Sequence, residues 1–296
     1  MTAALRACLA VAALSTVTAS TVDSYTEEIL NARQRRVERL TAPDGWLSLI
    51  GLHFLQPGAN TIGTATDNGI VLAAGPKHFG TASLAPDGKV TFTPAADAAV
   101  QIDGRAAGPT ELKLGVDGKP TLVTSGTVSF YLIERGGRLA LRVKDSAAPR
   151  RTNFLGLDYF PLDRTWRVEA RWVPFDPPRE VPITNIIGNV SKERVPGKAV
   201  FEREGRTFEL YPIVEGPNEP LFFVISDATS GKESYSAARF LDAEWPVDGK
   251  VVLDFNKAVN PPCAFTPFAT CPLPPKENQL PIAVTAGEKK YRGEHE

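Results

Sequence analysis

Histidine, cysteine and methionine are scarce in this chain of 296 residues, which contains three histidines, three cysteines and one methionine. The histidines, His53, His78 and His295, are far apart, so the sequence offers no imidazole-based metal site and no obvious base for a hydrolase. The motifs Gly-x-Ser-x-Gly and His-Glu-x-x-His and the glycine fingerprint of dinucleotide-binding folds are also missing. We therefore expect no metal and no cofactor.

Positive charge is not in surplus, because 33 Lys and Arg residues stand against 34 Asp and Glu residues. A protein that binds a phosphate backbone needs cations to neutralise it, so we expect no nucleic acid as a partner. A continuous apolar run of the length that crosses a membrane, about 20 residues, is missing too. We therefore expect no membrane span.

The first residues, MTAALRACLAVAALSTVTAS, have the pattern of a secretory signal peptide. Arg6 precedes a short apolar stretch, and Val17-Thr18-Ala19 places small or compact residues where a signal peptidase reads. We predict that residues 1–19 are a signal peptide, which puts the mature chain in the periplasm or outside the cell. A disordered cytoplasmic leader is the alternative.

Cleavage would leave two cysteines, Cys263 and Cys271, eight positions apart. In an oxidising compartment such a pair is most simply a disulfide, since a zinc site would need two further soft ligands. The segment 260–281 around the pair contains seven prolines in 22 residues, too many for a helix or a central strand. We predict an ordered proline-rich segment that is held by this disulfide.

Residues 20–40 predict one short amphipathic helix, clearest from Tyr25 to Leu40. Ser24 can cap it, and Glu27 completes a Ser-x-x-Glu capping box. The helix also carries a cluster of arginines, which we expect to form a solvated face, with an anionic partner as the alternative. The cluster consists of Arg33, Arg35, Arg36 and Arg39.

Short strands separated by turns dominate the remaining sequence, which contains 24 glycines and 25 prolines. Alternating apolar residues flank turns such as Gly136-Gly137 at roughly the spacing typical of a β-sandwich. We predict a mainly β fold, with a β-sandwich domain at 41–146 and a second antiparallel β domain, a sandwich or an open barrel, at 147–296. The apolar run 221–225 should be a strand covered on both faces.

Two polar clusters in the second domain form the candidate site. One follows the apolar run 221–225, and the other follows the strand near 251–255. The ends of buried strands are where rigid scaffolds present functional side chains, but the same residue types also fix loops through hydrogen bonds to the backbone. The candidate ligand-binding residues are Asp227, Thr229, Ser230, Tyr235, Arg239, Asp254, Asn256, Asn260, Glu277 and Asn278.

Several long motifs resemble one bacterial family. They are FLGLDYFP at 154–161, DATSG at 227–231, and the run from Asp254-Phe255-Asn256 to Cys263-Ala264-Phe265. These motifs resemble domain of unknown function 1684, and the resemblance covers most of residues 41–291. It implies no established activity and no catalytic residues.

The first domain resembles a forkhead-associated sandwich through Ile62-Gly63, Asn68 and His78. Thr64 stands where that family has its phosphate-binding arginine, and Gly75 stands where it has a serine. A phosphate gains most from charge-assisted hydrogen bonds, so without these donors we expect no binding of phosphothreonine peptides.

These observations predict an exported, non-catalytic protein of the cell envelope that binds a small molecule or an envelope protein. The alternative is a hydrolase of sugars or esters that uses Asp227 with Asp254 or Glu277 as catalytic carboxylates. The two hypotheses differ in what the carboxylates face. In an enzyme they would converge on an open pocket, and in a scaffold each would be buried against backbone amides.

Overall fold

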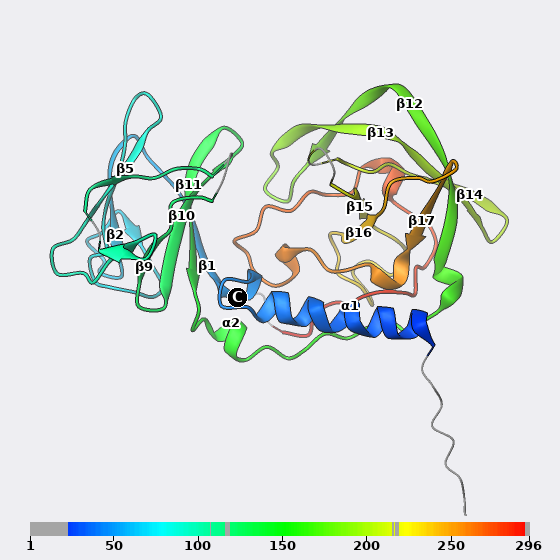
Figure 1. Cartoon of the computed structure of the whole chain (residues 1–296), viewed down its shortest axis with the longest axis horizontal. Coiled ribbons are helices and arrows are strands. Elements are labelled where there is room, and N and C mark those ends of the chain that lie inside the picture. The colour runs from blue at the N-terminus through cyan, green and yellow to red at the C-terminus, as the bar shows by residue number, and fades with distance from the viewer. Residues whose placement is uncertain (1–22, 107, 116–118, 215, 217–218, 294–296) are drawn as a thin grey trace, which may run out of the picture.

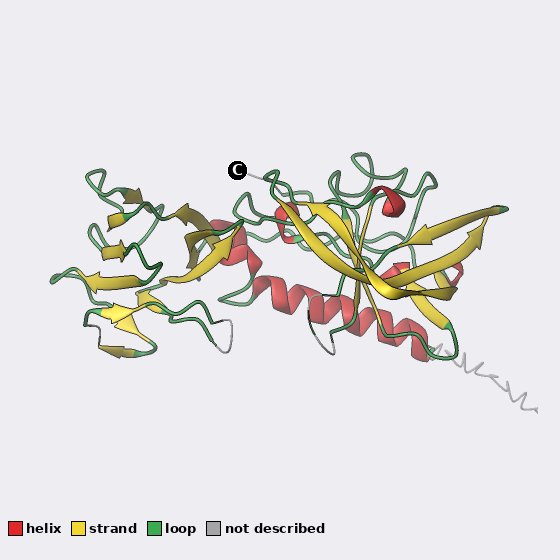
Figure 2. Cartoon of the chain, turned by 90° about the horizontal axis from the view of Figure 1, so that it is seen from above, coloured by secondary structure: helices red, strands yellow, loops and turns green. Residues whose placement is uncertain are grey.

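Figure 1 shows the computed structural model of the chain, which describes residues 23–293 except 107, 116–118, 215 and 217–218. The predicted signal peptide, residues 1–19, lies outside the described residues. The fold is mainly β with one amphipathic N-terminal helix of 18 residues, as predicted. Two bodies of strands lie side by side along the long axis, and the helix runs along the second body (Figures 1 and 2). No helix within the described ranges is long and apolar enough to cross a membrane.

The helix α1 (Ser24–Thr41) begins one residue earlier than the capping box predicts. Asp23, not Ser24, is the N-cap, and its carboxylate accepts hydrogen bonds from the N–H groups of Tyr25 and Thr26. Aspartate caps a helix as well as serine does, and its charge also suits the positive end of the helix dipole. Ile29 and Leu40 are fully buried, so the apolar stripe of the helix faces the protein.

The prediction that the helix arginines form a solvated face is wrong for two of them. Arg36 Nε lies 3.0 Å from the buried Glu288 Oε1, and an Arg36 N–H donates to the Asn260 carbonyl at 2.7 Å. The Arg33 guanidinium lies 4.1 Å from the centre of the Tyr159 ring. These partners belong to segments far along the chain, so helical spacing alone does not reveal them. The arginines that remain exposed are Arg35 and Arg39.

The first body consists of two sheets around one shared core. The six-stranded sheet has the order β1-β11-β10-β9-β6-β7, from β1 (Leu49–Phe54), β6 (Gln101–Ile102), β7 (Arg105–Ala106), β9 (Val123–Ser125), β10 (Val128–Arg135) and β11 (Arg138–Asp145). The five-stranded sheet has the order β3-β2-β4-β5-β8, from β2 (Gly58–Gly63), β3 (Ile70–Val71), β4 (Gly80–Leu84), β5 (Val90–Pro94) and β8 (Thr110–Glu111). Phe79, Phe92 and Phe130 pack edge to face in the core, with ring centres 5.1 to 6.4 Å apart.

The strand β11 has two different faces. Leu141 and Val143 point into the core of the first body, so alternation places Arg142 and Lys144 on the opposite face. The turn Gly136-Gly137 joins β10 to β11 with positive φ at both residues, which is the predicted hairpin chemistry. In Figure 1, β1, β10 and β11 lie on the side of the first body that is nearest the second body.

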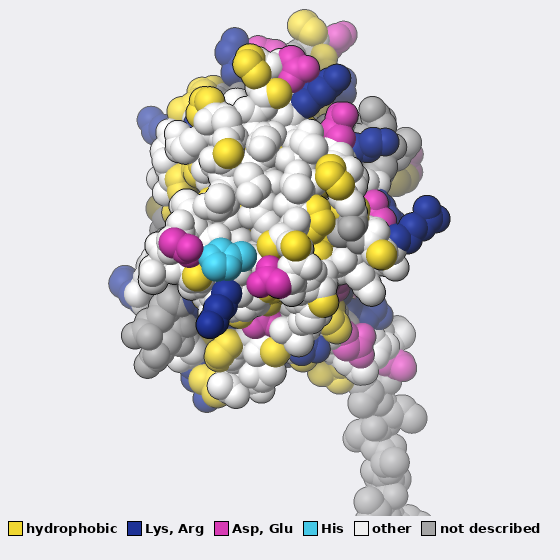
Figure 3. Space-filling model, turned by 90° about the vertical axis from the view of Figure 1, so that its left-hand side faces the viewer, with side chains coloured by type: hydrophobic (Ala, Val, Ile, Leu, Met, Phe, Trp, Pro, Cys, Tyr) yellow, Lys and Arg dark blue, Asp and Glu magenta, His cyan; other side chains and the backbone are white. Residues whose placement is uncertain are grey.

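Figure 3 shows the outer end of the first body, where Lys, Arg, Asp and Glu side chains are scattered among uncharged ones. Arg135 and Arg142 line a pocket together with residues of the second body.

The second body is built around one long antiparallel hairpin, whose two strands curve over the remaining elements (Figure 2). Its four-stranded sheet has the order β14-β13-β12-β17, from β12 (Arg167–Thr184), β13 (Val190–Arg203), β14 (Arg206–Leu210) and β17 (Lys250–Asp254). A separate pair consists of β15 (Leu221–Ile225) and β16 (Arg239–Ala243). The strand β15 is buried on both faces as predicted, since Phe223 packs in one core cluster and Val224 in another.

Short helical turns link these strands. They are η1 (Trp46–Ser48), α2 (Pro149–Thr152), η2 (Arg164–Trp166), η3 (Phe255–Lys257), η4 (Pro262–Ala264) and η5 (Lys276–Asn278). The proline-rich segment 260–281 contains only the turns η4 and η5, so it forms neither a longer helix nor a central strand, as predicted.

Candidate functional site

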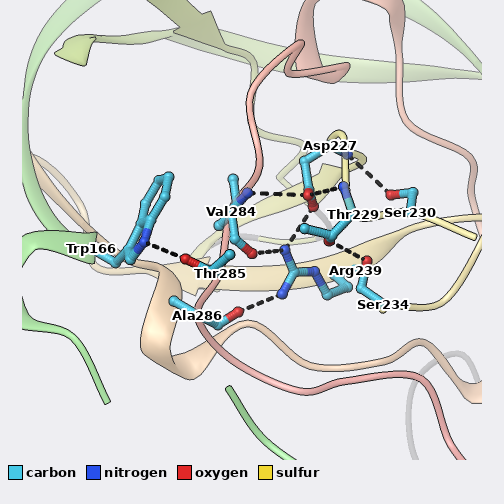
Figure 4. Close-up of polar contacts among 9 residues, drawn as sticks. All are labelled: Trp166, Asp227, Thr229, Ser230, Ser234, Arg239, Val284, Thr285 and Ala286. Atoms are coloured by element: carbon cyan, nitrogen blue, oxygen red, sulfur yellow. Dashed lines mark hydrogen bonds and ion pairs between the residues drawn. The ribbon is translucent and has the colours of Figure 1, made fainter. Parts of the chain in front are cut away.

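The first predicted cluster is a buried ion pair with backbone partners on every side (Figure 4). Asp227 Oδ2 accepts a hydrogen bond from Arg239 at 2.7 Å, and Asp227 Oδ1 accepts from the N–H groups of Thr229 and Val284 at 2.8 and 3.2 Å. Arg239, 1% exposed, also donates to the carbonyls of Val284 and Ala286. Both charged groups therefore join the loop after β15 to the C-terminal segment.

The hydroxyl groups of this cluster have partners as well. Thr229 Oγ1 lies 2.7 Å from Ser234 Oγ, and Ser230 Oγ accepts from the Asp227 N–H at 3.1 Å. The Tyr235 hydroxyl donates to the Cys263 carbonyl at 3.1 Å. This is the pattern of a loop that its own side chains hold in place.

The second cluster fixes the first turn of α1. The Tyr25 hydroxyl lies 3.0 and 3.1 Å from the two carboxylate oxygens of Asp254, and Asn256 donates to Asp254 Oδ1 at 3.2 Å. Asn256 also exchanges hydrogen bonds with the backbone of Asp163. Burial and the nearby Asp254 charge raise the pKa of Tyr25 to about 12. Asp254 and Asn256 lie together as predicted, but the predicted reason is wrong, because the strand ends at Asp254 and Asn256 belongs to η3. Both residues hold the helix.

The remaining predicted residues lie apart from one another. Asn278 is fully buried and exchanges hydrogen bonds with the backbone of Tyr211, while Asn260 donates to the Lys289 carbonyl. Glu277 is exposed on η5. Asp227 and Asp254 share no hydrogen-bond partner in the part of the chain that the structure describes. The contact of these residues with a ligand stays a prediction.

The two cysteines lie side by side in the proline-rich segment. Both are buried, and Cys271 Sγ accepts a hydrogen bond from the Cys263 N–H at 3.2 Å. The sulfur atoms are not bonded to each other. A hydrogen bond between the thiols, and then burial, raise the pKa of Cys271, while the same hydrogen bond lowers the pKa of Cys263. The disulfide stays a prediction.

A cleft of about 500 Å³ opens where the two bodies meet, and we call it the junction cleft. Its walls come from the β10–β11 hairpin, η1, the tip of the β12–β13 hairpin and the proline-rich segment. Two contacts between the bodies lie beside it. Arg135 Nε of the first body donates to Thr270 Oγ1 of the second at 3.0 Å. Gly136 lies so close to Asn189 that an added Cβ would be 2.5 Å from Asn189 Nδ2. Cys271 also lines the cleft.

Arg142 is the notable side chain of the junction cleft. The residue is 7% exposed, and its buried Nε has no hydrogen-bond partner among the described residues. Its guanidinium lies 5.2 Å from the centre of the Trp46 ring. Sequence reasoning missed this residue, although the alternation that places Leu141 in the core also places Arg142 on the other face.

Comparison with known proteins bears mainly on the second body. Residues 152–289 match a family model described as "Protein of unknown function (DUF1684)". A search of curated proteins returns no match.

Several chains of solved structures match this one, among them the following two. The solution NMR structure of an uncharacterized protein from Haloarcula marismortui is 33% identical, over 47% of this chain and 78% of that one, with a TM-score of 0.40. The crystal structure of Rad53 in complex with AMP-PNP is 11% identical, over 74% of this chain and 51% of that one, with a TM-score of 0.19. Neither superposition is close enough to support a conclusion about the fold.

Proposed function

We propose that this chain, which belongs through residues 152–289 to the DUF1684 family, is an exported, non-catalytic binding protein of the cell envelope whose small-molecule ligand occupies the junction cleft. Ligand sites are usually concave, largely preformed and placed at domain interfaces. The junction cleft has this position and about 500 Å³ of volume. The observation that carries the proposal is the buried guanidinium of Arg142, which lines the cleft and has no acidic partner in the described chain.

The predicted carboxylates support binding over hydrolysis. Glycosidases hold two carboxylates about 5 Å or about 6.5–9.5 Å apart across the bond that they cleave. Asp227 is instead neutralised by Arg239, Asp254 accepts from Tyr25, and Glu277 is exposed on a separate turn. None of these three carboxylates lines the junction cleft.

Export rests on the sequence of residues 1–19, and the cysteine pair fits that location. In an oxidising compartment, Cys263 and Cys271 would form a disulfide in the proline-rich wall of the cleft. Because Cys271 lines the cleft, this bond would hold the wall in one position.

Blocking the junction cleft from an exposed position tests the proposal. Ser191 lines the cleft and is exposed, so Ser191→Trp should fill the space without disturbing a core. The next residue, Lys192, is exposed and points to the other face of β13, so Lys192→Trp is the matched control. A library of small polar fragments is screened against the three proteins by thermal shift and calorimetry.

We expect fragments that bind the wild-type chain and Lys192→Trp but not Ser191→Trp. Fragments that bind all three proteins equally, or none that binds the wild type, would contradict the proposal. Turnover of chromogenic glycosides or esters that Asp254→Asn abolishes would favour the hydrolase instead.

A further inference from the structure

Arg142 is held in an environment that is costly for a cation. Removing a guanidinium from water is unfavourable unless an anion or several acceptors replace the water. Within the described residues, its guanidinium lies 5.2 Å from the centre of the Trp46 ring, its buried Nε has no hydrogen-bond partner, and its charge also acts on Cys271. A cation over an aromatic ring gains little compared with a buried ion pair. Among the described residues, no carboxylate forms an ion pair with this positive charge.

A second arginine adds to the positive potential of the junction cleft. Arg135, on the neighbouring strand β10, is half-buried and donates to Thr270 Oγ1 and to the Glu134 carbonyl. Burial first, and then the charge of Arg142, lower the pKa of Arg135. Both arginines line the same cleft.

The acidic side chains of the junction cleft do not neutralise these arginines. Glu134 and Glu193 also line it, but neither forms an ion pair with Arg135 or Arg142 in the described part of the chain. Glu134 is exposed and uses its backbone carbonyl, not its carboxylate, to contact Arg135. The space in front of Arg142 is therefore open to an anion from outside the chain.

Three of the apolar residues that line the junction cleft are aromatic. Phe222 and Phe240 pack edge to face with ring centres 4.8 Å apart, and Trp46 lies beside Arg142. Aromatic walls of this kind favour a flat apolar group.

We infer that the ligand of the junction cleft is an oxyanion, a carboxylate or a phosphate, carried on a flat apolar group, and that Arg142 with Arg135 binds its charge. This inference rests on the proposed function, since it names the class of ligand for the same cleft. A planar guanidinium binds carboxylate and phosphate oxygens in pairs, which a lysine cannot reproduce.

Four probes of similar size separate charge from shape: phenyl phosphate, benzoate, benzyl alcohol and benzylamine. Each is titrated calorimetrically into the mature wild-type chain and into Arg142→Met, Arg142→Lys and Ser191→Trp. Arg138→Met is the matched control, because Arg138 lies on the same strand, is exposed and does not line the cleft.

We expect phenyl phosphate and benzoate to bind the wild type at least tenfold more tightly than benzyl alcohol or benzylamine. Arg142→Met should reduce the affinity for both anions tenfold or more and change that for benzyl alcohol less than twofold. Arg142→Lys should recover only part of the loss, and Arg138→Met should behave as the wild type. The stronger of the two anions identifies the ligand as a phosphate or a carboxylate.

Several results would overturn the inference in different ways. If benzyl alcohol bound as tightly as the anions and Ser191→Trp abolished both, the cleft would bind ligands but the anionic class would be wrong. If Ser191→Trp left anion binding intact, or the wild type bound none of the probes, the cleft itself would be wrong. Anion binding that depends on Arg142 but not on Ser191 would place the anion in the neighbouring pocket, which Arg142 shares with Lys144, and would also contradict the inference.

Discussion

The ion pair between α1 and the C-terminal segment should make a large, localised contribution to stability. Arg36 Nε lies 3.0 Å from Glu288 Oε1, and the two side chains are 12% and 0% exposed. The other carboxylate oxygen of Glu288 accepts from the Asn260 N–H at 2.7 Å. Removing one partner of a buried pair typically costs about 3–5 kcal/mol, because it leaves a buried charge uncompensated.

Arg36→Gln should therefore lower the free energy of unfolding by about 3 kcal/mol. This value is at the lower end of that range because the glutamine amide can still donate a hydrogen bond to a backbone carbonyl. Arg35→Gln is the control, since Arg35 is exposed on the same helix, and it should change the stability by less than about 0.5 kcal/mol. The assay is urea unfolding of the mature chain at neutral pH, with the midpoint and slope fitted for each variant.

The pH dependence of this loss follows from Glu288. Burial raises the pKa of Glu288, and the Arg36 charge opposes that shift. Removing Arg36 should raise the pKa of Glu288 further, so the folded variant binds a proton more readily than the unfolded chain. The loss of unfolding free energy in Arg36→Gln should then be small in acid, below the pKa of about 4.3 that Glu288 has in the unfolded chain. It should grow as the pH rises through the pKa of Glu288 in the folded protein.

Adding Glu288→Gln to Arg36→Gln should recover stability at neutral pH, because no charge is then left buried. Equal stabilities of Arg36→Gln and Arg35→Gln would refute the reasoning, and so would a deficit that does not change with pH.

Three further predictions concern the other buried polar groups. Asp227→Asn should cost about 3–4 kcal/mol in urea unfolding because it leaves Arg239 buried without its counterion, whereas a loss below about 1 kcal/mol would show that the pair is not structural. Arg142→Met should raise the free energy of unfolding by about 1 kcal/mol, since it removes a buried cation that has no acidic partner among the described residues. Residues kept for function often lower the stability of a protein, so that replacing them stabilises it. A clear destabilisation by Arg142→Met would mean that the arginine serves the fold. Thiol labelling of the denatured, unreduced protein, taken from an oxidising compartment, should find neither Cys263 nor Cys271 free, and two labelled thiols would exclude the disulfide.

Local rules predict much of the fold. Period-two alternation identifies the β10–β11 hairpin, including its Gly136-Gly137 turn, and the apolar run 221–225 identifies a strand that is buried on both faces. The helix is predicted to within a residue at each end, because capping and apolar spacing are local properties.

The tertiary contacts of the predicted polar residues are not local. Arg36 and Glu288 are 252 positions apart, so a charged stripe on a helix resembles a solvated face until the tertiary contact is known. Asp227 shows the opposite case: its position after a buried strand suggests a site, yet its partners Arg239 and Val284 complete a structural network.

The junction cleft exists only because two bodies dock. Arg142 lies on the face of β11 that points away from the core, where sequence reasoning expects an exposed cation. Its guanidinium lies near Trp46 of η1, and it lines a cleft together with residues of the second body, which no pattern within β11 predicts.

A crystal structure of the mature chain with phenyl phosphate tests the central claim most directly. The account predicts a phosphate group in the junction cleft, with oxygens about 2.7–2.9 Å from the guanidinium nitrogens of Arg142 and the phenyl ring against Phe222 and Phe240. A junction cleft that remains empty at saturating phenyl phosphate, or a phosphate bound only at another surface, would contradict it.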